Sequence, residues 1–452
     1  MAQITVKYDP ALEIEPIEDL MYATNPDEDP TDSTAPEVQQ TKITGVIAPL
    51  IKVNKIVIKW DDIKSFYLES TGVLPTLSFS FYDTTGFTQY LDQPGNDNQV
   101  LVQILPPFEN AYKKINLKFF ISSVSIRSGV VYIDAVYNVP ALYNSYLKSF
   151  GNISTYEFVD RIAKDSGLGL ASNIDGTEDS RYIYINNQNY VDALKSEISR
   201  SGDAHCVLDA WVDMHNYLVI ADMYERYNAN DDNLKVWTTT DNVQDVNNDG
   251  KPLEALEIDA VITNHNAINY TQLFTNRLNI NNSSGSSVQR GTDKIIETYF
   301  FDKEESSSAL IQDGDIKKDT FIKSIYRGEI FGDHDYLFAA ECRSAFLQKV
   351  KSTCIDVVLS TPLLGLERGG RVNVKWYVTD DLVNNIQKDL QDDVNTNIPT
   401  DPDENKEVGV PMLNKQLSGQ YLIIGTQIKF VEGEWEYRLT LARPASTVNT
   451  YF

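Results

Sequence analysis

Alternation of apolar and polar side chains with a period of two is the feature that most restricts the fold of this sequence. Leu77, Phe79 and Phe81 alternate with Ser78 and Ser80, a pattern typical of a strand with one buried face. Other short segments rich in Val, Ile, Phe and Thr recur along the chain, so the sequence predicts a mainly β protein. These segments are residues 55–60, 100–105, 119–126, 130–137, 353–359, 371–378, 420–430 and 434–441.

The first block of strands spans residues 41–148 and predicts a barrel or sandwich. Within it, Arg127-Ser-Gly129 reads as a hairpin turn between two strands. Residues 149–225 then change to a mixed pattern that predicts a small α/β subdomain. Ser154 and Glu157 fit a capping box and Gly167 a helix stop. A second helix is expected to begin near Asn189 and to end at Gly202.

The rest of the chain predicts strands with two interruptions. Residues 226–445 form a second β unit that carries a helix over residues 333–351 and an acidic, proline-bearing insertion over residues 379–416. Residues 446–452 are a C-terminal tail. Residues 1–40 hold five prolines and a group of acidic residues, so we expect an extended arm there, either loose or ordered against a neighbouring subunit.

The charge of the chain limits its partners. The 65 acidic residues outnumber the 39 lysines and arginines and give a formal net charge of −26. Such a chain repels phosphate backbones, so sequence-specific nucleic-acid binding is not expected. The three cysteines, Cys206, Cys342 and Cys354, are too few and scattered for a disulfide framework, which indicates a reducing compartment. Neither a signal peptide nor an apolar run long enough to span a membrane is expected.

Motifs that carry catalysis are not found. His205 stands beside Cys206, but neighbouring residues of a strand point to opposite faces, so we expect no nucleophile pair there. Asp245, Asn247 and Asp249 match the first half of a calcium loop, yet Leu256 stands where the closing carboxylate is needed. An ordinary turn is favoured. The sequence therefore predicts neither catalytic residues nor a metal or cofactor, and a protein that is not an enzyme.

The order of several segments resembles a known family. In the first block these are Leu74-Pro75 leading into residues 77–83, Gly86-Phe87, residues 91–94 and residues 137–140. In the middle they are residues 149–156, 162–170, 172–174 and 177–179, and near the end residues 366–374, 417–424 and 437–443. This sequence of segments resembles the baseplate central hub proteins of contractile-tailed phages, the family of the T-even hub and of the base of type VI secretion spikes.

The resemblance implies a fold of two tail-tube-like antiparallel β-barrels plus the small α/β subdomain. It implies a structural virion protein that forms a homotrimer, adapts a sixfold tail tube to a threefold central spike, and encloses part of the DNA ejection channel. Its partners would be the tail tube protein, the central spike protein, baseplate wedge proteins and the tape measure protein. The location would be the tail baseplate of the virion, after assembly in the host cytoplasm.

The proposed channel carries a further expectation about charge. Since DNA would pass through the ring, residues that face the channel are expected to be acidic or neutral overall, with Lys and Arg directed to the subunit interfaces. The alternatives are a tail-associated cell-wall hydrolase, for which the surplus of carboxylates is the sole support, and a receptor- or carbohydrate-binding β-protein, for which the support is the richness in Tyr. The N-terminal arm and the insertion at 379–416 depart from the family pattern and leave the peripheral contacts open.

Overall fold

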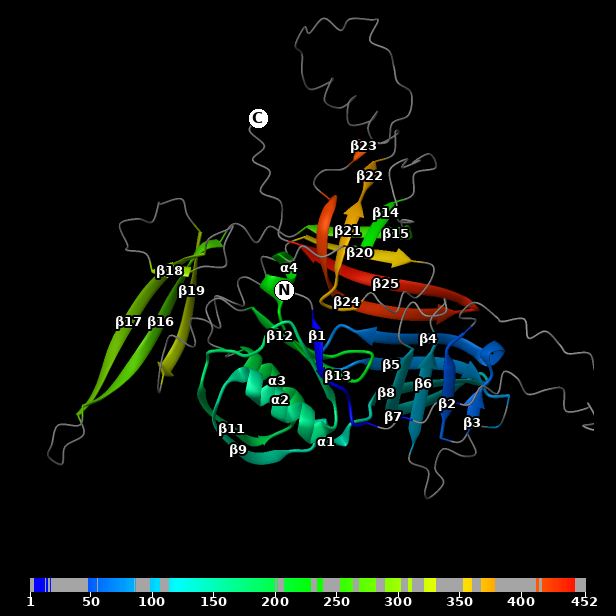
Figure 1. Cartoon of the computed structure of the whole chain (residues 1–452), viewed down its shortest axis with the longest axis horizontal. Coiled ribbons are helices and arrows are strands. Elements are labelled where there is room, and N and C mark those ends of the chain that lie inside the picture. The colour runs from blue at the N-terminus through cyan, green and yellow to red at the C-terminus, as the bar shows by residue number, and fades with distance from the viewer. Residues whose placement is uncertain are drawn as a thin grey trace, which may run out of the picture.

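The computed structural model describes a β-rich chain with helices gathered in one unit (Figure 1). The ranges described are 4–12, 14, 17, 48–54, 56–84, 86, 98–105, 114–199, 201, 207–228, 234–238, 253–262, 268–281, 289–301, 308–310, 321–330, 353–359, 367–378, 412–413 and 417–443. The expected helix at 333–351 and the tail at 446–452 lie outside these ranges, as does the insertion at 379–416 apart from a two-residue strand.

The first barrel is built from seven consecutive strands around an apolar core. The alternating segment around Phe79 is strand β5, whose phenylalanines are buried together with Phe66 and Phe119 from neighbouring strands. The hairpin turn lies where it was predicted, with Ser128 at φ 51° and Gly129 at φ 78°. The strands are β2 (Leu50–Val53), β3 (Ile56–Ile58), β4 (Ile63–Ser70), β5 (Thr76–Tyr82), β6 (Gln99–Ile104), β7 (Ile115–Arg127) and β8 (Val130–Tyr137), and a 3-10 turn, η2, covers Trp60–Asp62.

The second barrel is a closed ring of six strands. Each strand bonds to the next in the order β21, β14, β15, β20, β25, β24, and β24 bonds back to β21. The expected antiparallel pairing holds except at β14, which is parallel to both of its neighbours. Parallel neighbours need long crossover connections, which local alternation does not reveal. The strands are β14 (Leu234–Thr238), β15 (Leu253–Ile262), β20 (Thr353–Leu359), β21 (Arg371–Lys375), β24 (Gly419–Val431) and β25 (Glu434–Arg443).

The two barrels share one continuous sheet of thirteen strands. Strand β24 of the second barrel pairs antiparallel with β4 of the first, from Thr426 opposite Ser70 to Val431 opposite Ser65. Main-chain hydrogen bonds therefore join the barrels directly, and in Figure 1 β24 lies beside β4 although about 350 residues separate them in sequence.

The α/β subdomain packs its helices between two small sheets. The sheet β1-β10-β13-β12 lies on one side and the pair β9-β11 on the other, as the lower left of Figure 1 shows. Part of the N-terminal arm belongs here, because β1 pairs antiparallel with β10 of its own chain. The elements are β1 (Thr5–Tyr8), α1 (Pro140–Tyr143), β9 (Tyr146–Ile153), α2 (Thr155–Ser166), β10 (Gly169–Ser172), β11 (Arg181–Gln188), α3 (Tyr190–Ser199), β12 (Leu208–Val212), β13 (Tyr217–Asp222) and α4 (Met223–Asn228).

A third set of strands, which the sequence pattern did not reveal, leaves the second barrel between β15 and β20. It forms a sheet in the order β18-β17-β16-β19, with a long antiparallel hairpin between β16 and β17. These strands are β16 (Ile268–Asn281), β17 (Gln289–Phe301), β18 (Ser308–Leu310) and β19 (Phe321–Ile330); a separate short pair is β22 (Tyr377–Val378) and β23 (Met412–Leu413).

Candidate functional site at the junction of the three units

A tight turn at Glu367–Gly370 lies where both barrels and the α/β subdomain meet. The amide of Gly370 donates to the carbonyl of Glu367 at 2.9 Å, which closes the turn. Gly369 has φ 81°, and a Cβ built there would lie 2.8 Å from Cδ1 of Ile4 and 3.2 Å from the Trp211 ring. Glycine at this position therefore meets two needs: a left-handed backbone and close contact with two side chains.

Arg368 joins the turn to the two other units. Its Nη2 lies 2.7 Å from Oδ2 of Asp209 on β12, and its Nη1 donates to the carbonyl of Gly72 at 2.7 Å, in the connection between β4 and β5. The guanidinium also lies 4.7 Å from the centre of the Trp211 ring. A planar group with five donors makes all of these contacts at once, which a lysine cannot do.

The turn is also tied to helix α4 and to strand β24. Nε of Arg226 on α4 donates to the carbonyl of Gly369 at 2.8 Å. The amide of Gly369 donates to the carbonyl of Ile423 at 2.8 Å, and the amide of Ile423 donates to Gly370 at 2.9 Å. The turn thus continues the barrel sheet while it holds α4.

The turn between β12 and β13 carries a cluster of titratable groups against Glu367. Oε1 of Glu367 lies 2.7 Å from Nε2 of His215. The buried carboxylate of Asp213 accepts from the amides of His215 and Tyr217, both at 2.8 Å. Burial, together with the nearby charge of Glu367, raises the pKa of Asp213 to about 7. The cluster thus brings a buried carboxyl group, an imidazole and a second carboxylate together at the junction.

The same turn contacts the first barrel. The hydroxyl of Tyr137 on β8 donates to Oδ1 of Asn216 at 2.6 Å, and Nδ2 of Asn216 donates to the carbonyl of Asn116 at 3.0 Å. The amide of Val212 donates to the carbonyl of Val73 at 2.7 Å. The hairpin β12–β13 is thus held on one side by the first barrel and on the other by the turn at Glu367–Gly370.

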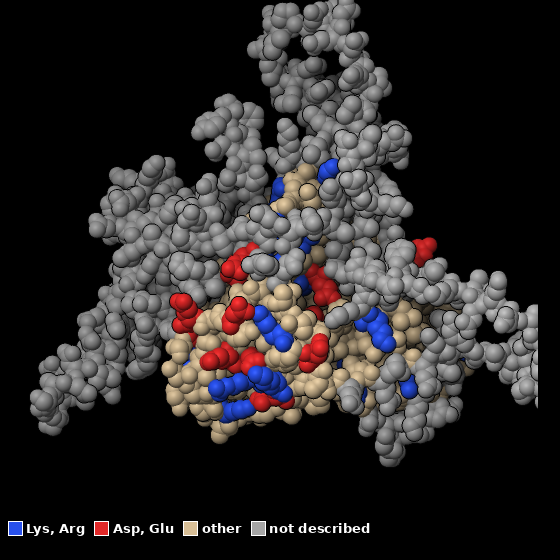
Figure 2. Space-filling model, viewed as in Figure 1, with Lys and Arg blue, Asp and Glu red and all other residues tan. Residues whose placement is uncertain are grey.

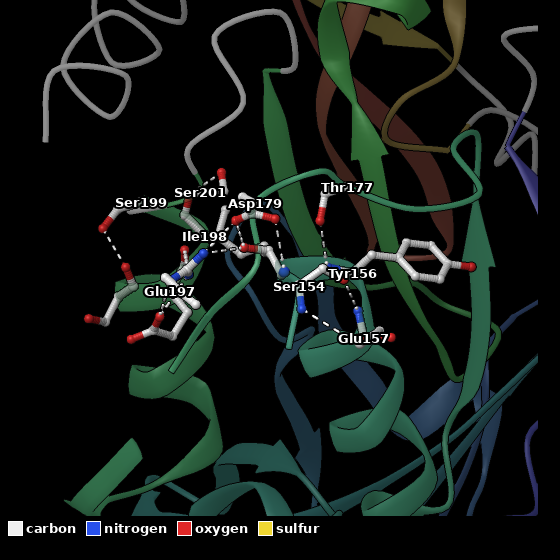
Figure 3. A network of polar contacts seen from close by, with 12 residues as sticks. Ser154, Tyr156, Glu157, Thr177, Asp179, Glu197, Ile198, Ser199 and Ser201 are labelled. Atoms are coloured by element: carbon white, nitrogen blue, oxygen red, sulfur yellow. Dashed lines mark hydrogen bonds and ion pairs between the residues drawn. The ribbon is translucent and has the colours of Figure 1, made fainter. Parts of the chain in front are cut away.

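A second polar network fixes the α/β subdomain internally (Figure 3). The predicted capping box is confirmed, since Ser154 accepts from the amide of Glu157 and the Glu157 side chain accepts from the amide of Ser154. The loop before β11 completes the cap: Asp179 accepts from the amide of Thr155 at 3.0 Å, and Thr177 accepts from the amide of Tyr156 at 3.1 Å. The first amides of α2 are satisfied by side chains, so the helix start is rigidly placed.

Arg181 links this cap to helix α3. It donates to Asp179 and, through Nη2, to Oε2 of Glu197 at 2.7 Å. Burial alone would raise the pKa of Asp179, but hydrogen bonds from Thr155 and Thr177 and the charge of Arg181 outweigh it and leave that pKa lowered. The carboxylate is therefore held ionised as part of a satisfied buried network. The segment at 177–179, which resembles the family, therefore has a structural role: it caps helix α2.

The surface of the α/β subdomain mixes charges of both signs. Figure 2 shows lysines and arginines beside acidic residues over this unit, at the lower left. Lysines of this unit form ion pairs with acidic side chains in Lys164–Asp160 at 2.7 Å, Lys7–Asp175 at 2.6 Å, and Lys148–Asp165. On the face drawn in Figure 2, acidic and basic side chains are interleaved.

An exposed apolar face lies on the outer side of the β9–β11 pair. Tyr182 and Leu147 are 74% and 73% exposed, and Tyr184 is 54% exposed. Large apolar side chains that stand together on a surface indicate a contact with another molecule. This face is the second candidate functional surface.

The residues that the sequence singled out for chemistry fall mostly outside the described ranges. Cys206, His205 and the loop at 245–250 are among them, so their predicted lack of a site stays a prediction. Within the described ranges, no three His, Cys, Asp or Glu side chains are grouped so that they could hold a metal ion. No helix described here is long and apolar enough to cross a membrane.

The junction itself was missed as a site. Its signal in the sequence is the pair of glycines after Glu367 and Arg368, which belongs to the family-like segment 366–374. The partners of Arg368, which are Asp209 and Gly72, lie more than 150 residues away in the chain, so nothing in the local pattern identified them.

Comparison with solved structures shows which known proteins share this fold. No protein-family model and no curated protein matches the sequence. Among solved structures, the 43 kDa tail protein of prophage MuSo2 from Shewanella oneidensis aligns with a TM-score of 0.51 at 10% identity, over 88% of this chain and 98% of that one. A tail protein of Neisseria meningitidis aligns at 0.46, with 10% identity over 88% and 96% of the two chains. A component of the Escherichia coli type VI secretion system aligns at 0.42, with 10% identity over 88% and 77%. The first of these alignments shows that this chain, with its paired barrels and α/β subdomain, has the fold of a prophage tail protein.

Proposed function

We propose that the chain is a structural, non-enzymatic subunit of a phage tail baseplate, and that three copies form its central hub. The observation that carries this proposal is the pair of barrels joined into one sheet through β4 and β24, in a fold shared with the Shewanella tail protein. The domain division expected from the sequence, with barrels at 41–148 and 226–445 around a subdomain at 149–225, is part of the proposal.

Symmetry gives the reason for three copies. Two similar barrels in each chain supply six barrels in a ring of three chains, which matches a sixfold tube on one side and a threefold spike on the other. Closed rings of identical subunits are the usual form of such assemblies. The tail tube protein, the central spike protein, wedge proteins and the tape measure protein are the proposed neighbours, and the virion baseplate is the proposed location.

The polar face of the thirteen-stranded sheet is the proposed channel wall. Across β4, β24 and β25, buried side chains alternate with polar ones that point away from the core. The basic side chains of Lys429 on β24 and Arg438 on β25 lie on this face. Lys429 is paired with Glu436 at 2.6 Å, and Thr440 donates to Asp356 at 2.8 Å. A lysine neutralised in this way binds passing phosphates weakly, which suits a channel for DNA.

Copy number in the purified tail tests the proposal. We expect electron microscopy of the particle to show three copies of this chain in a ring between tube and spike. Six copies, or a position away from the tail axis, would overturn the hub assignment. A clearing band from the purified chain in a peptidoglycan zymogram would overturn the non-enzymatic part and favour the cell-wall hydrolase.

A further inference from the structure

A buried guanidinium at the end of the second barrel has one edge without hydrogen-bond partners. Arg443, the last residue of β25, is only 8% exposed. Its Nη1 donates to the carbonyl of Ser418 at 2.6 Å, and its plane lies 4.9 Å from the centre of the Tyr421 ring. In the part of the chain that the structure describes, Nε and Nη2 have no hydrogen-bond partner, although both atoms are shielded from solvent.

The surroundings hold this side chain in place. Gly419 has φ 139°, and a Cβ there would lie 2.7 Å from Nη1, so glycine is needed for the guanidinium to reach Ser418. On the other side of Gly419, the side chain of Gln420 accepts from Nη2 of Arg371, a second arginine that is 7% exposed. Two buried arginines therefore flank the segment 418–420, and the open edge belongs to the one at the barrel end.

Electrostatics reinforces this geometry. Burial raises the pKa of the Tyr227 hydroxyl on α4, while the charges of Arg443 and Arg371 both act against that rise. A buried cation that lacks a counterion is costly, and a second cation nearby adds to the cost. Positive charge at the end of this barrel thus favours the approach of an anion.

The geometry of the two unpartnered donors, Nε and Nη2, indicates which kind of anion would bind. Nε–H and Nη2–H point in parallel from the same edge of the guanidinium, and such a two-donor fork matches the two oxygens of a carboxylate. We propose that Arg443 is a carboxylate-binding site, occupied either by a free small carboxylate or by an acidic side chain of a protein. This site does not depend on the hub assignment.

Thermal unfolding in acetate tests the free ligand. With sodium acetate in place of sodium chloride at equal concentration and neutral pH, we expect the midpoint of the full-length protein to rise by roughly 2 °C or more. Arg443→Met, which keeps the bulk and removes the fork, is expected to lose the rise. Arg443→Lys, which keeps the charge without the fork, is expected to lose most of it. Arg438→Met, on the same strand, serves as the control and keeps the full rise.

A map of the assembled particle tests the protein-borne ligand. An Asp or Glu oxygen within hydrogen-bonding distance of both Nε and Nη2 would support the site and identify its source, even if acetate has no effect on the isolated chain. An acetate effect that persists in Arg443→Met would overturn the proposal. So would the combination of no acetate effect and a fork that faces only water or main-chain carbonyls in the particle.

Discussion

Nη2 of Arg368 lies 2.7 Å from Oδ2 of Asp209, and this ion pair joins the turn before β21 to strand β12 of the α/β subdomain. Asp209 and Arg368 belong to units that are far apart in the sequence. The ion pair therefore forms only when the α/β subdomain packs against the turn of the second barrel.

Replacing Arg368 with Ala should weaken this docking. The change removes the ion pair, the bond to the Gly72 carbonyl and the contact with Trp211, and it leaves Asp209 without this cation. We expect a loss of about 2–4 kcal/mol in the free energy of unfolding, measured by urea denaturation. Lys164→Ala, which breaks a surface pair within helix α2, should cost less than about 0.5 kcal/mol. Equal losses for the two variants would contradict a role for Arg368 at the junction.

Two glycines with the same backbone angle separate strain from contact. Gly369 and Gly151 have φ 81° and φ 80°, but a Cβ at Gly151 meets nothing within 4 Å. Both alanine variants should lose about 1–2 kcal/mol from the left-handed backbone. Gly369→Ala should lose more, because its Cβ would lie 3.2 Å from the buried Trp211 ring, which has little room to shift, whereas Cδ1 of Ile4 at 2.8 Å can rotate away. If calorimetry gives the same midpoint for both variants, close packing at the turn is not important.

The buried carboxylate of Asp213 should make stability depend on pH. Its pKa is raised in the folded state to about 7, so the stability it contributes is complete below its unfolded pKa and is lost as the pH rises through the folded one. The groups that face it are Glu367 from the turn, His215 and Tyr217 from its own hairpin, and Tyr137 from the first barrel.

Asp213→Asn should remove this pH dependence, because an asparagine side chain does not titrate. The variant should still fold, since its amide oxygen can accept the two backbone hydrogen bonds. Urea denaturation at about pH 5 and about pH 8 would measure the pH dependence. We expect the wild-type protein to lose more stability between these pH values than the variant does. A variant that loses as much as the wild type would show that Asp213 does not titrate in this range.

The exposed face of the β9–β11 pair should matter for assembly and not for folding. Tyr182→Asp and Tyr184→Asp place a charge on an exposed side chain, so each should change the free energy of unfolding by less than about 0.5 kcal/mol. If the face contacts another tail protein, both variants should reduce incorporation of the chain into particles, measured by complementation with purified tails. Ser199→Asp, at the exposed end of helix α3 and off this strand pair, is the control for charge alone. Normal incorporation of both tyrosine variants would exclude this face as a contact.

Local patterns predicted the elements and long-range contacts decided their arrangement. The capping box at Ser154, the helix stop at Gly167 and the turn at Gly129 depend on neighbouring residues, so the sequence revealed them. The pairing of β1 with β10 joins residues more than 160 positions apart, and the proline-rich arm gave no hint of it. The parallel placement of β14 between β15 and β21 also depends on long-range pairing, and the period of a strand does not encode its direction.

The junction was hidden for a related reason. Arg368, Asp209 and Glu367 are polar residues in a chain with 104 charged ones, and nothing in their local spacing marks them. Burial and partner choice give them their role, and both are properties of the folded chain. The two glycines after Arg368 are the one local sign of the junction, because they favour a tight turn that other residues adopt less readily.

The pairing of β4 with β24 has a mechanical consequence. Six opposed residue pairs, from Thr426 and Ser70 to Val431 and Ser65, carry the connection between the barrels. A load along these strands would have to shear all of the hydrogen bonds together, whereas a load across them would open the pairs one after another. The joint is therefore stiffest along the strand direction, and any mismatch between the two halves of the chain has to be absorbed by the loops around them.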